Sequence, residues 1–364
     1  MNSIAFTGGG TGGHIYPGLA IASRLKESCS CRVFWIGSAS GMDRAIVERA
    51  GLEFFGISSG KLRRYFSFKN FLDIFRVLAG FFAALGILRR ERPALLFSKG
   101  GFVSVPPCAA AAFLKIPVFT HESDLSPGLA TRINARFAER IFVPYEKSAA
   151  FFKAAEGEKV RVSGNPIRAE FAAADAARGR SFLGLGPEER ILLVLGGSLG
   201  SAEINSLVKA CLPELTRHYT VVHQYGEGND GGLPAAAARY RPYASFKEEI
   251  PDVIAAAELV LCRSGAGTIW ECKYLAKPMV LIPLRGSGTR GDQVENARLF
   301  QEAGAAICLD DEASLRAENL SALITSLAED PQRRRAMGEA KIGEGDAASY
   351  ITEEIINRIG RDNE

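Results

Sequence analysis

The stretch SIAFTGGGTGGHIYPGLA, residues 3–20, decides the fold class of this chain. A short apolar run ends at Thr7, five of the six residues from Gly8 to Gly13 are glycine, and a helical pattern begins near Pro17. A glycine loop between a strand and a helix lets the backbone approach an anionic group at the helix N-terminus. We therefore interpret the stretch as the first βα unit of a parallel sheet, with a loop that approaches a ligand.

Short apolar runs that predict buried strands alternate with helical patterns along the rest of the chain. The runs of the first half are SIAF, CRVFWIG, EFFGI, ALLFS, PVFT, RIFVP and VRVSG. After an alanine-rich, polar stretch at 169–190, the alternation restarts with ILLVLGGSLGSAEIN, TVVHQYG, ASF, ELVLCRSGAGT and PMVLIP. We predict an α/β protein with two Rossmann-like domains, 1–165 and 166–344. The pattern leaves open whether the C-terminal helix, 345–364, packs back on the first domain or on the second.

The composition is that of an ordinary globular protein, with 364 residues, 47% hydrophobic and 23% charged, and a net charge of +3. So slight a positive charge gives no reason to expect nucleic acid as a partner. The amino-terminal residues lack a signal-peptide pattern, and no apolar run reaches the roughly 18 residues that a membrane span needs. We therefore expect a cytoplasmic protein. Seven scattered cysteines without CxxC or HxxxH spacing indicate reduced thiols and no metal site.

The first glycine loop fits neither of the two common nucleotide-binding motifs. Gly8, Gly10 and Gly13 match the spacing GxGxxG, but NAD binding also needs an acidic residue about 20 positions later, at the end of the second strand. That strand ends in WIGSAS, without Asp or Glu. A P-loop needs Lys and then Ser or Thr where His14 and Ile15 stand. The sequence therefore predicts no NAD or ATP site of the usual kind, and no other cofactor.

Three further strands also end in glycine loops: SKGGFVSVP at 98–106, LGGSLGSAEIN at 195–205 and CRSGAGTIWE at 262–271. In an open α/β sheet, ligands bind beyond the carboxyl ends of the strands. Glycine loops in both domains therefore predict one ligand site in a cleft between them. No DxD motif is present, so the sequence offers no carboxylate pair of that kind to hold a metal–diphosphate complex.

Several motifs together resemble those of the MurG glycosyltransferases. They are GGGTGGHIYPGLA, SSGKLRR, SKGGFVSVP, HESDLSPGLA, SGNPIR, GGSLGSAEIN, CRSGAGTIWE and GDQVENA, in register from residue 4 to about 305. The resemblance implies the two-domain GT-B fold and transfer of N-acetylglucosamine (GlcNAc) from UDP-GlcNAc to the muramyl 4-hydroxyl of lipid I, the undecaprenyl-diphospho-muramoyl-pentapeptide. It also implies an inverting displacement that gives lipid II for peptidoglycan synthesis, at the cytoplasmic face of the cell membrane.

The resemblance assigns residues of both domains to UDP-GlcNAc: Thr11, Gly12, Gly13, Asp124, Arg168, Ser198, Ala266, Gly267, Thr268, Ile269, Glu271, Gln293 and Asn296. Glu271 would accept from both ribose hydroxyls, and Gln293 with Asn296 would donate to and accept from the sugar hydroxyls. Without a metal, helix N-termini, amides and an arginine such as Arg168 would stabilise the leaving diphosphate. Many members of the family carry Asn at the position of Asp124.

Two histidines are candidates for the general base. His14 ends the first glycine loop, and His121 with Glu122 ends the strand PVFT. An imidazole titrates near neutrality, so either could accept the proton of the attacking hydroxyl. We favour His14 as the catalytic base, with Glu122 as its orienting partner or its competitor. The alternative is that His14 only donates to phosphate, and His218 and His223 are predicted to be structural.

The segment 61–90 places basic residues at both ends of an aromatic and apolar stretch. This pattern is typical of a segment that lies at a membrane interface and attracts anionic lipid. A peripheral enzyme with a polyprenyl-linked acceptor needs such a contact. A buried core helix is the alternative.

Two other functions stay open at this point. One is another GT-B transferase that moves a UDP-sugar to a different lipid acceptor, and the other is a non-catalytic module that binds a nucleotide sugar. Detectable turnover would exclude the non-catalytic module. A panel of donors with lipid I analogue and diacylglycerol as acceptors would distinguish a transferase with another lipid acceptor from one that acts on lipid I.

Overall fold

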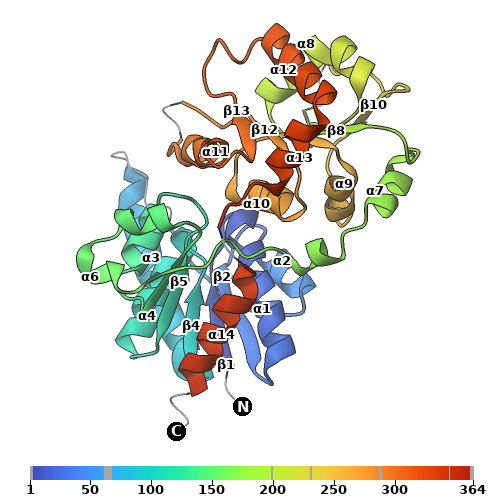
Figure 1. The fold of residues 1–364 in the computed structure, drawn as a ribbon. Coiled ribbons are helices and arrows are strands. Elements are labelled where there is room, and N and C mark those ends of the chain that lie inside the picture. The colour runs from blue at the N-terminus through green and yellow to red at the C-terminus, as the bar shows by residue number, and fades with distance from the viewer. Residues whose placement is uncertain are drawn as a thin grey trace. The chain divides into compact units, whose positions relative to one another are not determined.

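The computed structural model describes residues 3–60, 68–197, 200–229, 232–286, 289–343 and 345–360. For residues 68–73 only the backbone is described. The chain forms two compact units (Figure 1). Unit 1 comprises Met1–Arg168 and Gly343–Glu364, and unit 2 comprises Ala169–Ile342. Each unit is a parallel sheet covered by helices. The predicted fold class, with two Rossmann-like domains, is therefore confirmed.

Within the described residues, unit 1 contains a seven-stranded parallel sheet in the order β3-β2-β1-β4-β5-β6-β7. Its strands are β1 (Ser3–Thr7), β2 (Arg32–Ser38), β3 (Glu53–Ile57), β4 (Leu95–Ser98), β5 (Val118–His121), β6 (Arg140–Val143) and β7 (Val160–Val162). The strand order runs outward from β1 in both directions, as in a Rossmann fold. The topological switch therefore lies between β1 and β4.

Helices cover both faces of this sheet (Figure 1). Ile4 and Phe6 of β1 share one apolar cluster with α1 (Tyr16–Ser28) and α14 (Ala347–Gly360). Ala5 belongs to another cluster, with α3 (Phe68–Glu91) and α4 (Val105–Phe113), as the two-residue period of a strand requires. The C-terminal helix thus packs on unit 1. The other helical elements of the unit are η1 (Gly12–His14), α2 (Asp43–Arg49), η2 (Phe102–Ser104), α5 (Leu129–Asn134), η3 (Glu146–Phe151) and α6 (Ala154–Gly157).

Unit 2 repeats the plan with a six-stranded parallel sheet over its described residues, in the order β10-β9-β8-β11-β12-β13. The strands are β8 (Ile191–Leu195), β9 (Thr220–Gln224), β10 (Tyr240–Tyr243), β11 (Leu259–Cys262), β12 (Met279–Leu281) and β13 (Ala306–Cys308). One face packs against the apolar sides of α8 (Ala202–His218) and α12 (Ala317–Glu329). The other helical elements are η4 (Ala169–Ala173), α7 (Ala176–Leu183), α9 (Ile250–Ala256), α10 (Ala266–Tyr274), α11 (Asp292–Glu302) and α13 (Pro331–Glu339).

One strand of unit 2 lies earlier than its sequence pattern indicates. The letters ASF, 244–246, predicted a strand, but β10 ends at Tyr243. Pro242 is tolerated in β10 because this strand forms an edge of the sheet, beside β9. The backbone N–H of Phe246 instead donates to Oε1 of Gln224, at 3.1 Å. The prediction of a strand at 244–246 is therefore wrong by a few residues.

Candidate active site

The glycine loops follow the strands that flank the topological switch of each sheet. In unit 1, residues 8–13 follow β1 and residues 99–101 follow β4. In unit 2, the chain from Gly196 follows β8 and the chain from Arg263 follows β11. Open α/β sheets bind ligands beyond the carboxyl ends of such strands. Each unit therefore carries a candidate ligand-binding edge of its own.

Packing within unit 1 explains much of the glycine content of the first loop. The buried carboxylate of Asp43, at the start of α2, accepts the backbone N–H groups of Gly10 and Ser38 at 3.0 Å each. A Cβ atom on Gly9 would lie 1.9 Å from Oδ2 of Asp43, and one on Gly10 would lie 2.8 Å from the ring of Phe102. Asp43 thus fixes the loop, a role that sequence reasoning missed.

The second half of this loop is more open. A Cβ on Gly13 would meet Oγ1 of Thr11 at 3.9 Å and nothing closer among the described residues. A Cβ on Gly12 would come within 3.0 Å of the ring of Tyr16. The guanidinium of Arg168 stacks on that ring, with its carbon 5.0 Å from the ring centre. The arginine of the SGNPIR motif therefore lies beside the loop, in unit 1.

His14 stands where the glycine loop becomes α1. Its half-buried ring lies against the glycine pair after β4. A Cβ on Gly101 would lie 3.0 Å from Cδ2 of the imidazole, and one on Gly100 would lie 3.8 Å from Nδ1. Both glycines have positive φ values, 83° for Gly100 and 78° for Gly101, which favour glycine over other residues. The SKGG motif therefore shapes the space that the imidazole occupies.

Glu122 organises the HESD loop, residues 121–128, which begins at the end of β5. Its Oε1 accepts the backbone N–H groups of Ser123 at 2.9 Å and Asp124 at 3.3 Å, and Oε2 accepts that of Gly128 at 3.0 Å. The residue is 4% exposed. Because both oxygens serve the backbone of the loop, this geometry favours a positioning role for Glu122 over that of the base. Asp124 is half-buried in the same loop.

Two other histidines, His121 and His223, are buried. His121 is fully buried, and its Nε2 lies 3.1 Å from the carbonyl oxygen of Gly164. Burial and the charge of Lys99 hold the pKa of His121 well below its usual value. The neutral ring therefore donates from Nε2, because a carbonyl oxygen only accepts. In unit 2, burial lowers the pKa of His223 to about 4.

In unit 2, α10 begins just beyond β11 with residues that the resemblance assigns to UDP. A Cβ on Gly265 or Gly267 would meet no described atom within 4 Å, so the start of the helix has room for a ligand. Ala266 and Ile269 are 7% and 0% exposed. The backbone N–H of Ile269 donates to the carbonyl oxygen of Gly265 at 3.2 Å, so this placement favours a structural role for Ile269 over direct contact with a ligand. Thr268 and, in the second turn, Glu271 are half-buried on the same helix.

Two further predicted sugar ligands, Gln293 and Asn296, lie on α11 beside the same loop. Oγ of Ser264 donates to the carbonyl oxygen of Gln293 at 2.7 Å, and Nδ2 of Asn296 donates to the carbonyl oxygen of Ser264 at 3.4 Å. Oε1 of Gln293 accepts the backbone N–H of Leu284 at 3.0 Å. Asn296 is fully buried. This placement favours a role for Asn296 in holding the loop over direct contact with a sugar.

The loop after β8 is tied to the loop after β11 by charged groups. Ser198 lies outside the described residues. Beyond it, Oγ of Ser201 accepts from Nη2 of Arg263 at 2.7 Å, and Oε2 of Glu203 accepts from Nη1 at 2.8 Å. Glu203 also pairs with Arg285. Sequence reasoning missed this network, although Arg263 stands inside the CRSGAG motif.

The segment 61–90 falls on α3 and on the residues before it. Residues 61–67 lie outside the described residues, so the basic cluster KLRR is not placed. Four large apolar side chains of α3 are 48% to 65% exposed: Ile74, Phe75, Leu78 and Phe82. Ala84 and Leu88 on the same helix are buried against the sheet. The alternative of a fully buried core helix is therefore wrong. None of the described helices combines the length and apolar character needed to cross a bilayer.

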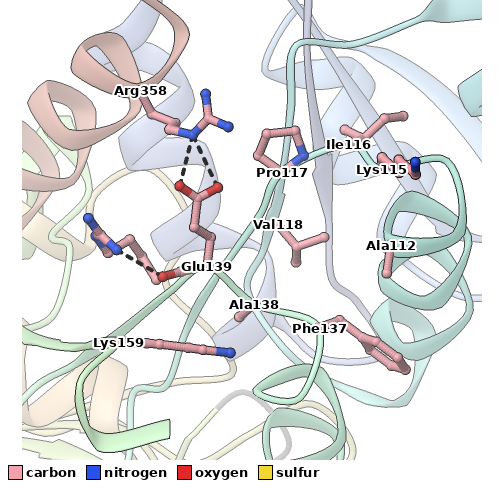
Figure 2. Close-up of a pocket in the computed structure, with 11 residues that line it drawn as sticks. Ala112, Lys115, Ile116, Pro117, Val118, Phe137, Ala138, Glu139, Lys159 and Arg358 are labelled. Carbon is pink, nitrogen blue, oxygen red and sulfur yellow. Dashed lines mark hydrogen bonds and ion pairs between the residues drawn. The ribbon is translucent and has the colours of Figure 1, made fainter. Parts of the chain in front are cut away.

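A hollow of about 540 Å³ opens at another edge of unit 1 (Figure 2). Its lining includes residues 116–118, where β5 begins, and Glu139 with Arg140, where β6 begins. Nε of Arg358 on α14 donates to both carboxylate oxygens of Glu139, at 2.9 and 3.1 Å. The hollow thus lies at the amino ends of these strands, whereas the glycine loops follow carboxyl ends. Among the described residues, including those that line this hollow, no group of three or more His, Cys, Asp or Glu side chains is arranged to hold a metal ion.

Comparison with known proteins identifies the family. Residues 4–143 match the glycosyltransferase family 28 N-terminal domain, and residues 191–353 match the family 28 C-terminal domain. A relative from Treponema denticola is 50% identical over 325 residues, which cover 84% of this chain and 83% of the relative. A relative from Treponema pallidum (strain Nichols) is 47% identical over 363 residues, 97% of this chain and 94% of the relative. Both are named UDP-N-acetylglucosamine--N-acetylmuramyl-(pentapeptide) pyrophosphoryl-undecaprenol N-acetylglucosamine transferase.

The chain belongs to the MurG family. The resemblance predicted from the motifs is therefore confirmed, as is the prediction of a glycosyltransferase. Solved structures agree with the MurG fold. The crystal structure of Acinetobacter baumannii MurG matches with a TM-score of 0.72 and 22% identity, over 98% of this chain and 100% of that one. The S. aureus MnaA–UDP co-structure matches with a TM-score of 0.71 and 14% identity, over 99% and 97%. These likenesses show the GT-B fold alone.

Proposed function

We propose that this chain transfers GlcNAc from UDP-GlcNAc to lipid I and so forms lipid II for peptidoglycan synthesis. The observation that carries the proposal is an identity of 41% to 50%, over at least 84% of the chain, to relatives whose name states this transfer. The glycine loops after β1, β4, β8 and β11 also follow the strands that flank the topological switch of each unit, where open α/β sheets bind ligands.

We assign the UDP portion of the donor to unit 2. The N-terminus of α10 carries partial positive charge and unpaired backbone N–H groups, which suit a diphosphate. The open space at Gly265 and Gly267 admits a ligand there. Glu271, half-buried on the same rigid helix, would accept from the two vicinal ribose hydroxyls. Ser198 and Gln293 would complete the donor contacts.

We assign the base to unit 1. In the proposed step, the 4-hydroxyl oxygen of the muramyl sugar attacks the anomeric carbon of GlcNAc, and the bond from that carbon to the diphosphate oxygen breaks. The hydroxyl proton passes to His14, and UDP leaves with the electron pair of the broken bond. Attack opposite to the leaving group inverts the anomeric carbon. Backbone N–H groups at Thr11, Gly12 and Gly13, together with Arg168, would stabilise the developing negative charge.

The exposed apolar side chains of α3 support a peripheral membrane contact at the cytoplasmic face. Phe75 and Phe82 are 56% and 65% exposed, and Arg89 and Arg90 end the same helix. Aromatic side chains beside basic ones suit the interface of an anionic bilayer. A polyprenyl-linked acceptor would be reached there.

A panel of donors and acceptors tests the proposed function. The purified chain is incubated with UDP-GlcNAc, UDP-glucose or UDP-GalNAc, and with a lipid I analogue or diacylglycerol, and products are followed by mass spectrometry. We expect one product that carries a single added GlcNAc, formed from UDP-GlcNAc and the lipid I analogue. Transfer to diacylglycerol alone would favour another lipid glycosyltransferase, and UDP binding without any transfer would favour a non-catalytic module.

A further inference from the structure

The loop after β4 buries a lysine for which the assignments above have no role. Lys99 is 1% exposed, and its Nζ donates to Oγ of Ser123 at 2.7 Å. That hydroxyl in turn donates to Oδ1 of Asn165 at 2.8 Å. Ser123 belongs to the HESD loop and Asn165 to the SGNPIR motif. One side chain therefore connects the SKGG motif to two other motifs of the candidate active site.

The same lysine also contacts the first glycine loop. Its backbone N–H donates to the carbonyl oxygen of Thr7 at 2.8 Å. A Cβ on Gly8 would lie 3.1 Å from Cβ of Lys99, so the two segments are closely packed. All these residues belong to unit 1 and are buried. A displacement of Lys99 would therefore also shift the start of the loop that ends at His14.

The HESD loop supplies the countercharge for this buried group. Burial lowers the pKa of Lys99 to about 8, and the attraction of Glu122 and Asp124 opposes that shift. Below about pH 8, the group is therefore an ammonium ion opposite two carboxylates, and its charge also disfavours protonation of the neighbouring His121. Removing the charge of Lys99 would leave these carboxylates without its attraction, and such a loss is costly where the groups are buried.

We propose that Lys99 is a positioning residue for glycosyl transfer, which holds the HESD loop through Ser123 and orients Asp124 toward the sugar donor as its partner in a charge pair. The inference rests on the proposed function, because it takes Asp124 as a contact of the donor.

A double-substitution cycle on the purified full chain tests this coupling. Lys99→Met keeps an unbranched side chain without charge or donor, and Asp124→Asn removes the opposite charge. We expect Lys99→Met to lower kcat/KM for UDP-GlcNAc about 10- to 100-fold, the size of interaction energies between residues of one hydrogen-bond or salt-bridge network. The double variant should recover to within about threefold of Asp124→Asn alone. If the fold-losses in kcat/KM of the two single variants multiply to give that of the double variant, the proposal is overturned.

Two readouts separate positioning from a loss of folded protein. An inactive fraction lowers kcat but leaves KM unchanged, whereas we expect Lys99→Met to raise KM for UDP-GlcNAc as well. Lys277→Met is the matched control, because Nζ of Lys277 in unit 2 donates to the carbonyl oxygens of Ala255 and Ala257 at 2.6 and 2.9 Å. Lys277→Met should leave KM for UDP-GlcNAc unchanged. Any effect it has on kcat/KM should multiply with that of Asp124→Asn, as expected for independent sites. An unchanged KM in Lys99→Met would contradict the proposal.

A milder variant covers the case in which Lys99→Met does not fold. Ser123→Ala removes one hydroxyl and keeps every charge, and we expect it to raise KM for UDP-GlcNAc several-fold. The same rise should be absent when Asp124 is already Asn, because the hydroxyl acts by holding Lys99, whose charge attracts that carboxylate. Equal effects of Ser123→Ala in both backgrounds would overturn the proposal.

The transfer activity and the role of Lys99 are tested separately. A wild-type chain that transfers no GlcNAc to any acceptor refutes the function. The interaction between Lys99 and Asp124 is then tested by urea unfolding of the wild type, Lys99→Met, Asp124→Asn and the double variant. A midpoint shift of the double variant that is smaller than the sum of the single shifts supports the pair, and a shift equal to the sum overturns it.

Discussion

His14 is the residue on which the proposed chemistry depends most directly. We predict that His14→Ala lowers kcat by roughly 10²–10⁴, the usual range for the loss of a general base, whereas the affinity for UDP-GlcNAc changes far less. His14→Gln keeps a hydrogen-bond donor but has no basic nitrogen, so it should be nearly as inactive. Steady-state kinetics with a lipid I analogue measure kcat, and calorimetry measures donor affinity.

A control histidine makes this test specific. His218, at the end of α8 in unit 2, lies outside the assigned contacts, and His218→Ala should keep kcat within about twofold. If His14→Gln retains most of the activity, His14 is a donor to phosphate, and the base must be sought at Glu122 or Asp124.

Lys99 provides a prediction about stability and pH. Because its pKa falls from 10.5 to about 8 on folding, the native state loses this proton first as pH rises, and the unfolded state then holds more protons. The free energy of unfolding, taken as wild type minus Lys99→Met, should therefore rise between about pH 8 and pH 10.5, by roughly 3 kcal/mol at most. Urea unfolding at several pH values measures this difference. A flat difference would show that Lys99 titrates normally in the folded chain, and a falling difference would show that folding raises its pKa.

The placement of some candidate site residues could be predicted from the sequence because they stand in short motifs at strand ends. His14 and Glu271 are of this kind, since a glycine loop or a helix start fixes their position locally. Asp43 and Lys99 could not be predicted in the same way. Their roles depend on burial and on partners 33 and 24 residues away, which only the folded sheet brings together.

Among the elements, α3 combines exposed phenylalanines with buried residues that face the sheet. We predict that Phe75→Asp with Phe82→Asp reduces binding to vesicles of phosphatidylglycerol and phosphatidylethanolamine by tenfold or more, because each buried phenylalanine contributes about 1.5–3 kcal/mol. UDP affinity should be unchanged. Vesicle sedimentation and calorimetry measure the two properties.

The control for this helix is Phe151→Asp, since Phe151 is 41% exposed elsewhere in unit 1. It should leave vesicle binding intact. If the double variant of α3 loses its circular dichroism signal, the two phenylalanines stabilise the fold and the membrane assignment fails.

Long buried strands could be predicted from their apolar runs, because both faces of a parallel sheet are covered. The edge strand β10 was misplaced, since Tyr240 is buried whereas the rest of the strand is partly exposed. The other edge strand of this sheet, β13, was not predicted, since two of its three residues are partly exposed. Element type thus follows from the sequence more readily than the exact bounds of short strands at a sheet edge.

For the whole molecule, the proposal divides binding and chemistry between the two units. Glu271→Ala in unit 2 should weaken UDP binding by about 1.5–3 kcal/mol, the value of a hydrogen bond to a charged group. The exposed Glu302 of α11 offers a matched control, and Glu302→Ala should bind UDP like the wild type. Calorimetry with UDP measures both. Unchanged affinity in Glu271→Ala would remove Glu271 as the ribose ligand.

The transfer itself, measured without metal, tests the proposed function most directly. The purified chain is treated with EDTA and then given UDP-GlcNAc labelled in the sugar together with a lipid I analogue. We predict that the label moves to the muramyl sugar, that one UDP is released for each GlcNAc transferred, and that the rate equals that of untreated protein. Complete loss of transfer in EDTA, restored by magnesium or manganese, would contradict the metal-independent mechanism, and absence of labelled disaccharide in either condition would contradict the function.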